Sequence, residues 1–185
     1  MKKEPKYKER REAEREVFIK KISSIDLADI ICVDESGVDD NIVPMYGWSE
    51  KGERSYAEQP SAKKKRLSIV AGYVYGTRTI LAPFEYEGYT DIHLFNSWFE
   101  QQLIPALRPG QVVLLDNAAF HRSLELDEIA AQHGVEILYL PAYSPDLNPI
   151  EKFWANLKRN IRKFIKTAEN FQEAITTAFK VTLSG

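Results

Sequence analysis

VVLLDNAAFH (residues 112–121) and LYLPAYSPDLNPIEKFW (residues 138–154) are the two stretches that decide the fold of this 185-residue chain. Each begins with a run of apolar residues, as strands buried on both faces of a sheet do. The first run ends abruptly at Asp116, and the second leads through a proline-rich loop to Glu151 at the start of a periodic, helix-forming segment. Both carboxylates are therefore expected where a regular element meets solvent.

The other elements are expected on either side of these stretches. In chain order we predict strands at 28–35, 67–75 and 78–86, a helix at 91–107, a strand at 111–116, a helix at 123–133, a strand at 135–140, and helices at 149–165 and 168–180. This order predicts an α/β fold with a mixed five-stranded sheet, three antiparallel strands followed by two parallel ones, flanked by helices. It is the order of the ribonuclease H-like fold.

Two local features of these elements are specific enough to test. Gly76-Thr77 predicts a tight hairpin turn between the second and third strands. The helix at 149–165 is expected to bury one apolar stripe, made of Ile150, Phe153, Trp154, Leu157, Ile161 and Phe164.

A third carboxylate, Asp34, ends the apolar run in ADIICVDES at residues 28–36. In the predicted sheet the first strand is central and neighbours the fourth, so Asp34 and Asp116 should lie side by side at the carboxyl ends of adjacent strands, where open α/β sheets bind their ligands. Mg²⁺ usually takes one or two protein carboxylates together with substrate phosphate oxygens. Asp34, Asp116 and Glu151 therefore predict metal-assisted phosphoryl transfer on nucleic acid.

Each of these carboxylates also has a purely structural interpretation. Asp34 and Asp116 could simply begin the turns that follow their strands. Glu151 fits the third position of a helix whose N-cap is Asn148 and whose first residue is Pro149, close to a capping box. The aspartate pair favours a site, because two close carboxylates resist joint ionisation without a cation between them. For Glu151, ligand and cap are equally good interpretations of the pattern.

Further polar residues lie near these motifs. Asn117 and His121 closely follow Asp116, and a structural role or substrate contact is favoured for His121 over metal ligation. Glu35 and Asp146 are spare carboxylates, either of which can replace an assigned ligand.

Basic residues gather in two runs although the formal net charge is −2. The runs lie at residues 63–66 and 152–166, the second next to Glu151, and such patches suit phosphate binding beside an acidic site. The alternative is a pair of solvated faces. The residues predicted to contact DNA are Lys63, Lys64, Lys65, Arg66, Asn117, His121, Lys158 and Arg162.

The first 25 residues are expected to form a connector helix, at 6–21, from a missing N-terminal DNA-binding region, with Val17 and Phe18 as its apolar anchors. Residues 26–185 are expected to form the catalytic domain. No apolar run approaches the roughly 20 residues that cross a bilayer, so no membrane partner is predicted. A single cysteine excludes an internal disulfide and fits a reducing compartment.

The motifs VDESG (33–37), LLDNAAFH (114–121) and YLPAYSPDLNPIEKFWANLK (139–158) resemble the catalytic domain of the D-D-E transposases of the mariner-like superfamily, specifically its bacterial insertion-sequence branch. The 34 residues between Asp116 and Glu151 match the spacing of that family. The last motif is highly specific, and the resemblance covers nearly the whole chain.

By this resemblance, Asp34, Asp116 and Glu151 are a metal-binding catalytic triad that uses two Mg²⁺ or Mn²⁺ ions. It implies cleavage of double-stranded DNA at element ends, strand transfer into a TA dinucleotide, a homodimer, and a bacterial cytoplasmic protein associated with the nucleoid. Such transposases read their ends with N-terminal helix-turn-helix modules, so a separate helix-turn-helix polypeptide is a further expected partner. The alternative is a non-catalytic DNA-binding or dimerising remnant that regulates an intact transposase, and a repair or recombination nuclease on the same fold is a weaker third option.

Overall fold

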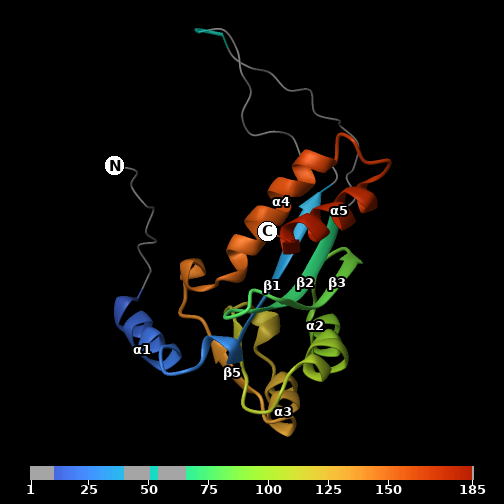
Figure 1. Ribbon diagram of the computed structural model, residues 1–185. Coiled ribbons are helices and arrows are strands. Elements are labelled where there is room, and N and C mark those ends of the chain that lie inside the picture. The colour runs from blue at the N-terminus through green and yellow to red at the C-terminus, as the bar shows by residue number, and fades with distance from the viewer. Residues whose placement is uncertain (1–10, 40–50, 54–65, 185) are drawn as a thin grey trace.

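The computed structural model describes residues 11–39, 51–53 and 66–184 (Figure 1). Its strands are β1 (Ile30–Asp39), β2 (Arg66–Val74), β3 (Ile80–Glu87), β4 (Val112–Leu115) and β5 (Glu136–Tyr139). Its α-helices are α1 (Glu12–Ile22), α2 (Ile92–Trp98), α3 (Leu124–Gln132), α4 (Ile150–Phe164) and α5 (Phe171–Ser184). Short 3₁₀ turns precede β1 (Leu27–Asp29), follow β4 (Ala119–His121) and precede α4 (Pro145–Leu147).

The five strands form one sheet in the order β3-β2-β1-β4-β5. The pairs β1–β2 and β2–β3 are antiparallel, whereas β1–β4 and β4–β5 are parallel. This confirms the predicted mixed sheet with β1 at its centre, beside β4. Connections that pass through helices force the later strands to add in parallel, which explains the switch of direction at β1.

The two faces of the sheet carry separate helical layers. Alternate residues of β1 serve the two layers: Ile30 and Cys32 pack in the cluster that includes α4 and α5, and Ile31 and Val33 pack in the cluster that includes α2 and α3. Because successive strand residues point to opposite faces, Asp34 lies on the face of α4 and Glu35 on the face of α2.

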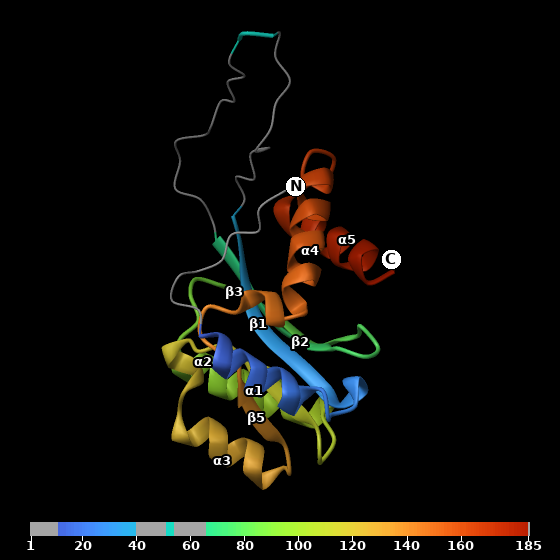
Figure 2. The same cartoon turned by 90° about the vertical axis from the view of Figure 1, so that its left-hand side faces the viewer.

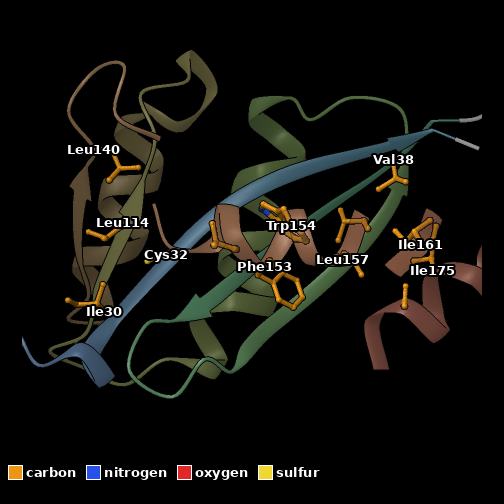
Figure 3. Close-up of a cluster of buried hydrophobic side chains, with 14 of the residues drawn as sticks. Ile30, Cys32, Val38, Leu114, Leu140, Phe153, Trp154, Leu157, Ile161 and Ile175 are labelled. Atoms are coloured by element: carbon orange, nitrogen blue, oxygen red, sulfur yellow. The ribbon is translucent and has the colours of Figure 1, made fainter. Parts of the chain in front are cut away.

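Helix α4 buries the apolar stripe that its sequence predicts. Ile150, Phe153, Trp154, Leu157 and Ile161 are buried, and Phe164 packs at the edge of the same cluster. Figure 3 shows Phe153, Trp154, Leu157 and Ile161 lying along α4 over the long strand β1. This stripe fixes the rotation of α4 about its axis and so the side on which Glu151 stands.

Three predicted elements differ from the structure. Strand β1 continues five residues beyond Asp34, so Asp34 lies within the strand and not at the carboxyl end that the predicted strand at 28–35 gave it. The helix predicted at 91–107 is α-helical only to Trp98, and then passes through a π-helical turn (Phe99–Leu103) and a 3₁₀ turn (Ile104–Ala106). Pro105 lacks the N–H that the next α-helical hydrogen bond needs, which favours a change of helix type before it.

Strands β2 and β3 form the predicted antiparallel hairpin, but its turn is longer than Gly76-Thr77, because residues 75–79 all lie between the two strands. The backbone N–H of Gly76 donates instead to the carbonyl of Leu27, and a Cβ on Gly76 would come within 2.7 Å of the backbone nitrogen of Ala28. Packing against the turn before β1 therefore sets this connection.

Helix α1 packs beside β5 and the loop that precedes α4 (Figures 1 and 2). Phe18 is buried in the core cluster as predicted, but Val17 is 71% exposed, so it is not an apolar anchor. Arg15 lies one turn before Phe18 on the buried face, and its guanidinium donates to both carboxylate oxygens of Asp146, at 3.2 and 2.7 Å. Within the described ranges, no helix is long and apolar enough to cross a membrane.

We expect Asp146→Asn to lower the free energy of unfolding by about 1–2 kcal/mol, because it removes the charged partner of the buried Arg15 guanidinium. Urea denaturation followed by circular dichroism measures this change. The matched control is Glu14→Gln, whose ion pair with Arg11 is exposed, so this variant should keep a stability close to that of the wild type. Equal stability of the two variants would contradict a structural role for the Arg15–Asp146 pair.

Candidate active site

Asp34 lies within β1, and Asp116 directly follows β4, the parallel neighbour of β1. The β1–β4 ladder pairs Ile30 with Val112 and Cys32 with Leu114. Asp34 and Asp116 each follow this last pair by two residues, Asp34 still within β1 and Asp116 directly after the end of β4. Both continue the alternation of residues that face α4, so their carboxylates emerge on the same side of the sheet.

Glu151 reaches this place from α4. Asp34, Asp116 and Glu151 all line one pocket of about 420 Å³, whose wall also contains Asn117 and Asn148. The structure thus brings together the three carboxylates that the sequence predicts from three different elements. Their carboxylates line the pocket but are too far apart to bind one ion together. Among the described residues, no group of three His, Cys, Asp or Glu side chains is close enough to hold a metal ion.

The two aspartates differ in electrostatic state. Burial, together with the negative charges of Glu151, Glu35 and Asp116, raises the pKa of Asp34 to about 8. Burial also acts to raise the pKa of Asp116, but hydrogen bonds from His121 and the backbone of Ala118, and the charge of His121, outweigh it and lower that pKa. Asp34 is therefore the carboxylate whose ionisation is unfavourable, and a cation in the pocket would relieve it. Oxygen donors around an unfavourable negative charge fit a hard divalent ion.

Glu151 does not cap its helix. Helix α4 begins at Ile150 with Pro149 as its N-cap residue, which makes no side-chain capping bond. The backbone N–H groups of Glu151 and Lys152 donate to the carbonyls of Asn148 and Pro149, each at 3.2 Å. The Glu151 side chain is exposed and forms no hydrogen bond with the residues that the structure describes. The capping-box interpretation is therefore wrong, because backbone carbonyls already take the first helical donors.

Asn148, the predicted N-cap, is buried beside the carboxylates. It is 5% exposed, and its Oδ1 atom has no hydrogen-bond partner among the described residues. Asn148 directly follows the 3₁₀ turn at Pro145–Leu147 and lines the same pocket as the three carboxylates.

His121 links Asp116, directly after β4, to Glu35 in the middle of β1. Its Nδ1 atom lies 2.6 Å from Oδ1 of Asp116, and its Nε2 atom lies 3.1 Å from Oε1 of Glu35. The ring centroid is 4.4 Å from those of both Phe95 and Phe120. Burial alone would lower the pKa of His121, but its hydrogen bonds to Asp116 and Glu35 and their charges raise that pKa to about 9.

The spare carboxylates have other partners. Glu35 faces His121 on the α2 side of the sheet, and Asp146 pairs with Arg15, so neither lines the pocket of the three carboxylates. Strand alternation alone could have shown that Glu35 points away from Asp34. Its pairing with His121 depends on the fold around it.

The predicted DNA-contacting residues have different surroundings. Lys63, Lys64 and Lys65 lie outside the described residues. Asn117 uses both ends of its side-chain amide within the chain: it donates to the carbonyl of Leu140 and accepts from Arg122. His121 has no exposed surface to offer to a duplex.

Arg66 opens β2 opposite Asp39, five places from the partner of Asp34, which is roughly 17 Å along the strand. Its guanidinium lies 4.9 Å from the ring centroid of Tyr89. Lys158 and Arg162 follow Glu151 by seven and eleven positions, about two and three turns along the same face of α4. Lys158 is half-buried and Arg162 is exposed, so basic groups continue the line of Glu151 away from the pocket.

Comparison with known proteins gives a family match and several similar folds. The family described as "DDE superfamily endonuclease" matches residues 29–172. A segment of 84 residues, 45% of this chain, is 31% identical to the Tc1 transposase of Caenorhabditis elegans, and covers 29% of that protein. A segment of 47 residues, 25% of this chain, is 40% identical to the Tcb2 transposase of Caenorhabditis briggsae, and covers 17% of that protein.

Among solved structures, the mariner Mos1 paired-end complex with Mg shares the fold at a TM-score of 0.63 and 14% identity, over 98% of this chain and 63% of that one. The Mos1 complex with Mn gives a TM-score of 0.61 at 14% identity, over 100% of this chain and 64% of that one. The chain matches less than a third of the length of the two nematode transposases. The bacterial insertion-sequence branch stays a prediction.

Proposed function

Since this chain belongs to the DDE superfamily endonucleases, we propose that it is the catalytic domain of a mariner-like transposase. It cleaves double-stranded DNA at element ends and transfers the freed 3′ ends into target DNA by in-line phosphoryl transfer. The observation that carries this proposal is the shared pocket of Asp34, Asp116 and Glu151, supplied by a central strand, its parallel neighbour and a packed helix.

Asp34, Asp116 and Glu151 are the residues that would hold Mg²⁺ or Mn²⁺, with two ions as the proposed number. Divalent ions bound there would neutralise charge on the attacking and leaving oxygens of the phosphodiester. The Mos1 paired-end complexes with Mg and with Mn, which share this fold, support this choice of ions. The unfavourable ionisation of Asp34 supports it independently, because a cation stabilises a carboxylate that is buried beside other negative charges.

Side chains around the pocket orient the proposed metal ligands and bind DNA phosphates. Oδ1 of Asp116 accepts from the backbone N–H of Ala118 at 2.8 Å and is also bound by His121, so Oδ2 is the oxygen left for the pocket. Glu151 projects from the first turn of α4, where the positive end of the helix dipole favours anionic groups, including a DNA phosphate. The buried stripe of α4 holds this carboxylate at the sheet edge while the exposed face carries Lys158 and Arg162 towards the flanking duplex.

Nicking of supercoiled plasmid by the purified chain tests the proposed reaction. We expect nicking with Mg²⁺ or Mn²⁺ and none in EDTA, and Asp116→Asn controls for contaminating nucleases. DNA binding without metal-dependent nicking would favour the non-catalytic remnant instead. A homodimer and a separate helix-turn-helix polypeptide are also proposed partners, and addition of such a polypeptide should restrict nicking to element ends.

We expect the double variant Lys158→Ala/Arg162→Ala to bind DNA with a shallower salt dependence. Each lost phosphate contact on duplex DNA should reduce the log–log slope by about 0.9. Sequence preference should hardly change, because phosphate contacts position the duplex without reading its bases. Fluorescence anisotropy across a salt series measures both quantities.

The control for this experiment is Lys20→Ala/Lys180→Ala, which removes two exposed positive charges from α1 and α5. The control should retain the wild-type slope. If the Lys158/Arg162 variant also retains the wild-type slope and affinity, that face of α4 is merely solvated and the DNA path runs elsewhere.

A further inference from the structure

His121 occupies a position that is unusual for a loop histidine. Its side chain is fully buried, and both ring nitrogens face carboxylates from neighbouring strands. Carboxylate oxygens accept hydrogen bonds, so both nitrogens act as donors, Nδ1 to Asp116 and Nε2 to Glu35. The ring therefore links Glu35, which lies within β1, to Asp116, which directly follows β4.

Several contacts fix this ring in place. Phe95 of α2 and Phe120 each lie against it at a centroid distance of 4.4 Å. The hydroxyl of Tyr139 donates to the backbone carbonyl of His121 at 2.9 Å, which holds the turn that carries the ring. Burying a polar ring between carboxylates is unfavourable unless its hydrogen bonds are satisfied, and here both are.

The bridge ends at one particular atom of the candidate active site. Oδ1 of Asp116 accepts from both Ala118 and His121, which fixes the rotation of the carboxylate. Glu35 is 14% exposed and does not line the pocket, so its contact with the site runs through the imidazole. In metal sites, groups of this kind orient the ligand, and their loss typically weakens metal affinity by about 10–100-fold.

We propose that His121 and Glu35 are positioning residues that hold the Asp116 carboxylate in the orientation needed for metal binding, and that His121 is not a DNA contact. This inference rests on the proposed function, because it takes Asp116 as a metal ligand. It assigns Glu35 a role that follows from its place on the reverse face of β1, where it secures the far nitrogen of the ring.

The test is titration of the purified chain with Mn²⁺ by isothermal calorimetry, without DNA. His121→Phe fills the space between the phenyl rings and removes both hydrogen bonds, and it should weaken Mn²⁺ binding by about 10–100-fold. His121→Asn retains a donor near the position of Nδ1 and should recover most of the affinity. His121→Gln places its donor near Nε2, towards Glu35, and should not.

Glu35→Gln still accepts the hydrogen bond from Nε2, so it should weaken Mn²⁺ binding less than His121→Phe does. Glu128→Gln, on the exposed face of α3, is the matched control and should leave Mn²⁺ binding unchanged. All variants should bind duplex DNA in EDTA as the wild type does. If His121→Phe fails to fold, the contrast between Asn and Gln at position 121 carries the same test.

Wild-type Mn²⁺ affinity in both His121→Phe and His121→Gln would overturn the positioning role. Loss of duplex DNA binding by these two variants in EDTA would also overturn it, because it would indicate that His121 contacts DNA. Asp116→Asn separates this failure from failure of the metal site itself. If Asp116→Asn loses Mn²⁺ binding while the His121 variants keep it, only the positioning role is wrong. If the wild type binds no Mn²⁺, or Asp116→Asn binds it normally, both proposals fail.

Discussion

Asp34→Asn is expected to abolish metal-dependent DNA cleavage and, at the same time, to stabilise the metal-free protein at high pH. Both results have one cause. The Asp34 carboxylate is buried near Glu151, Glu35 and Asp116, and its pKa is raised to about 8. The charge that the metal needs is therefore unfavourable when no metal is bound, and asparagine removes it without changing the shape of the side chain.

The pH dependence of this effect has a definite sign. The folded-state pKa of about 8 lies above the unfolded value of about 3.9, so the folded protein binds the proton more tightly. The stabilisation from protonated Asp34 is complete below the unfolded pKa and is lost as pH rises through the folded one. One pKa unit corresponds to about 1.4 kcal/mol of unfolding free energy. Even half of this shift, about 2 pKa units, would therefore make Asp34→Asn more stable than wild type by on the order of 3 kcal/mol at high pH.

Thermal and urea unfolding in EDTA at pH 5 and pH 9 measure this prediction. The variant should be more stable than wild type by a smaller margin at pH 5 than at pH 9, because pH 5 lies between the unfolded and folded pKa values. Adding Mg²⁺ at pH 9 should stabilise the wild type more than the variant, because only the folded wild type has the complete set of ligands. A variant that is less stable than wild type at both pH values would show that the Asp34 carboxylate is well accommodated without metal.

Glu151→Gln should reduce single-turnover cleavage by about a thousandfold, since a metal–ligand charge contributes several kcal/mol at the transition state and each 1.4 kcal/mol is a factor of ten. Its stability in EDTA should stay within about 0.5 kcal/mol of wild type, because the side chain is exposed and caps nothing. Single-turnover cleavage of a duplex oligonucleotide measures the change in rate, and urea unfolding in EDTA measures the change in stability.

The control for Glu151→Gln is Glu128→Gln, another exposed helical glutamate, which should cleave normally. Retained cleavage combined with lowered stability in Glu151→Gln would return Glu151 to a structural role. This pair of measurements distinguishes the ligand from the cap independently of any metal-binding assay.

Much of the fold follows from patterns that act over short distances. The apolar run before Asp34 and the run before Asp116 specify buried strands, and chirality and connection rules leave few ways to arrange them. The observed order β3-β2-β1-β4-β5 is the result, and it brings the two aspartates together. The stripe on α4 likewise fixes the side of Glu151.

The predictions that failed depend on contacts between distant segments. For His121 only the predicted DNA contact disagrees with the structure, because Phe95 and Glu35 come from other elements and bury the ring, whereas a structural role is also favoured from the sequence. The connection after β2 was predicted from its own residues, whereas the backbone of Leu27 determines its path. A single sequence does not encode such partners in any local pattern.

The three carboxylates are not held in place by the same forces. Asp34 is held by the pairing of β1 with β2, and Asp116 directly follows β4, whereas Glu151 owes its position to the packing of aliphatic and aromatic side chains such as Leu157 and Ile161. Exchanging one apolar residue for another of different shape shifts a packed helix while the chain still folds. In a gene family that multiplies and then drifts, copies can thus lose activity through changes between hydrophobic residues alone. An intact set of acidic residues in such a copy is evidence of descent, and the apolar face of α4 must be inspected before the copy is counted as functional.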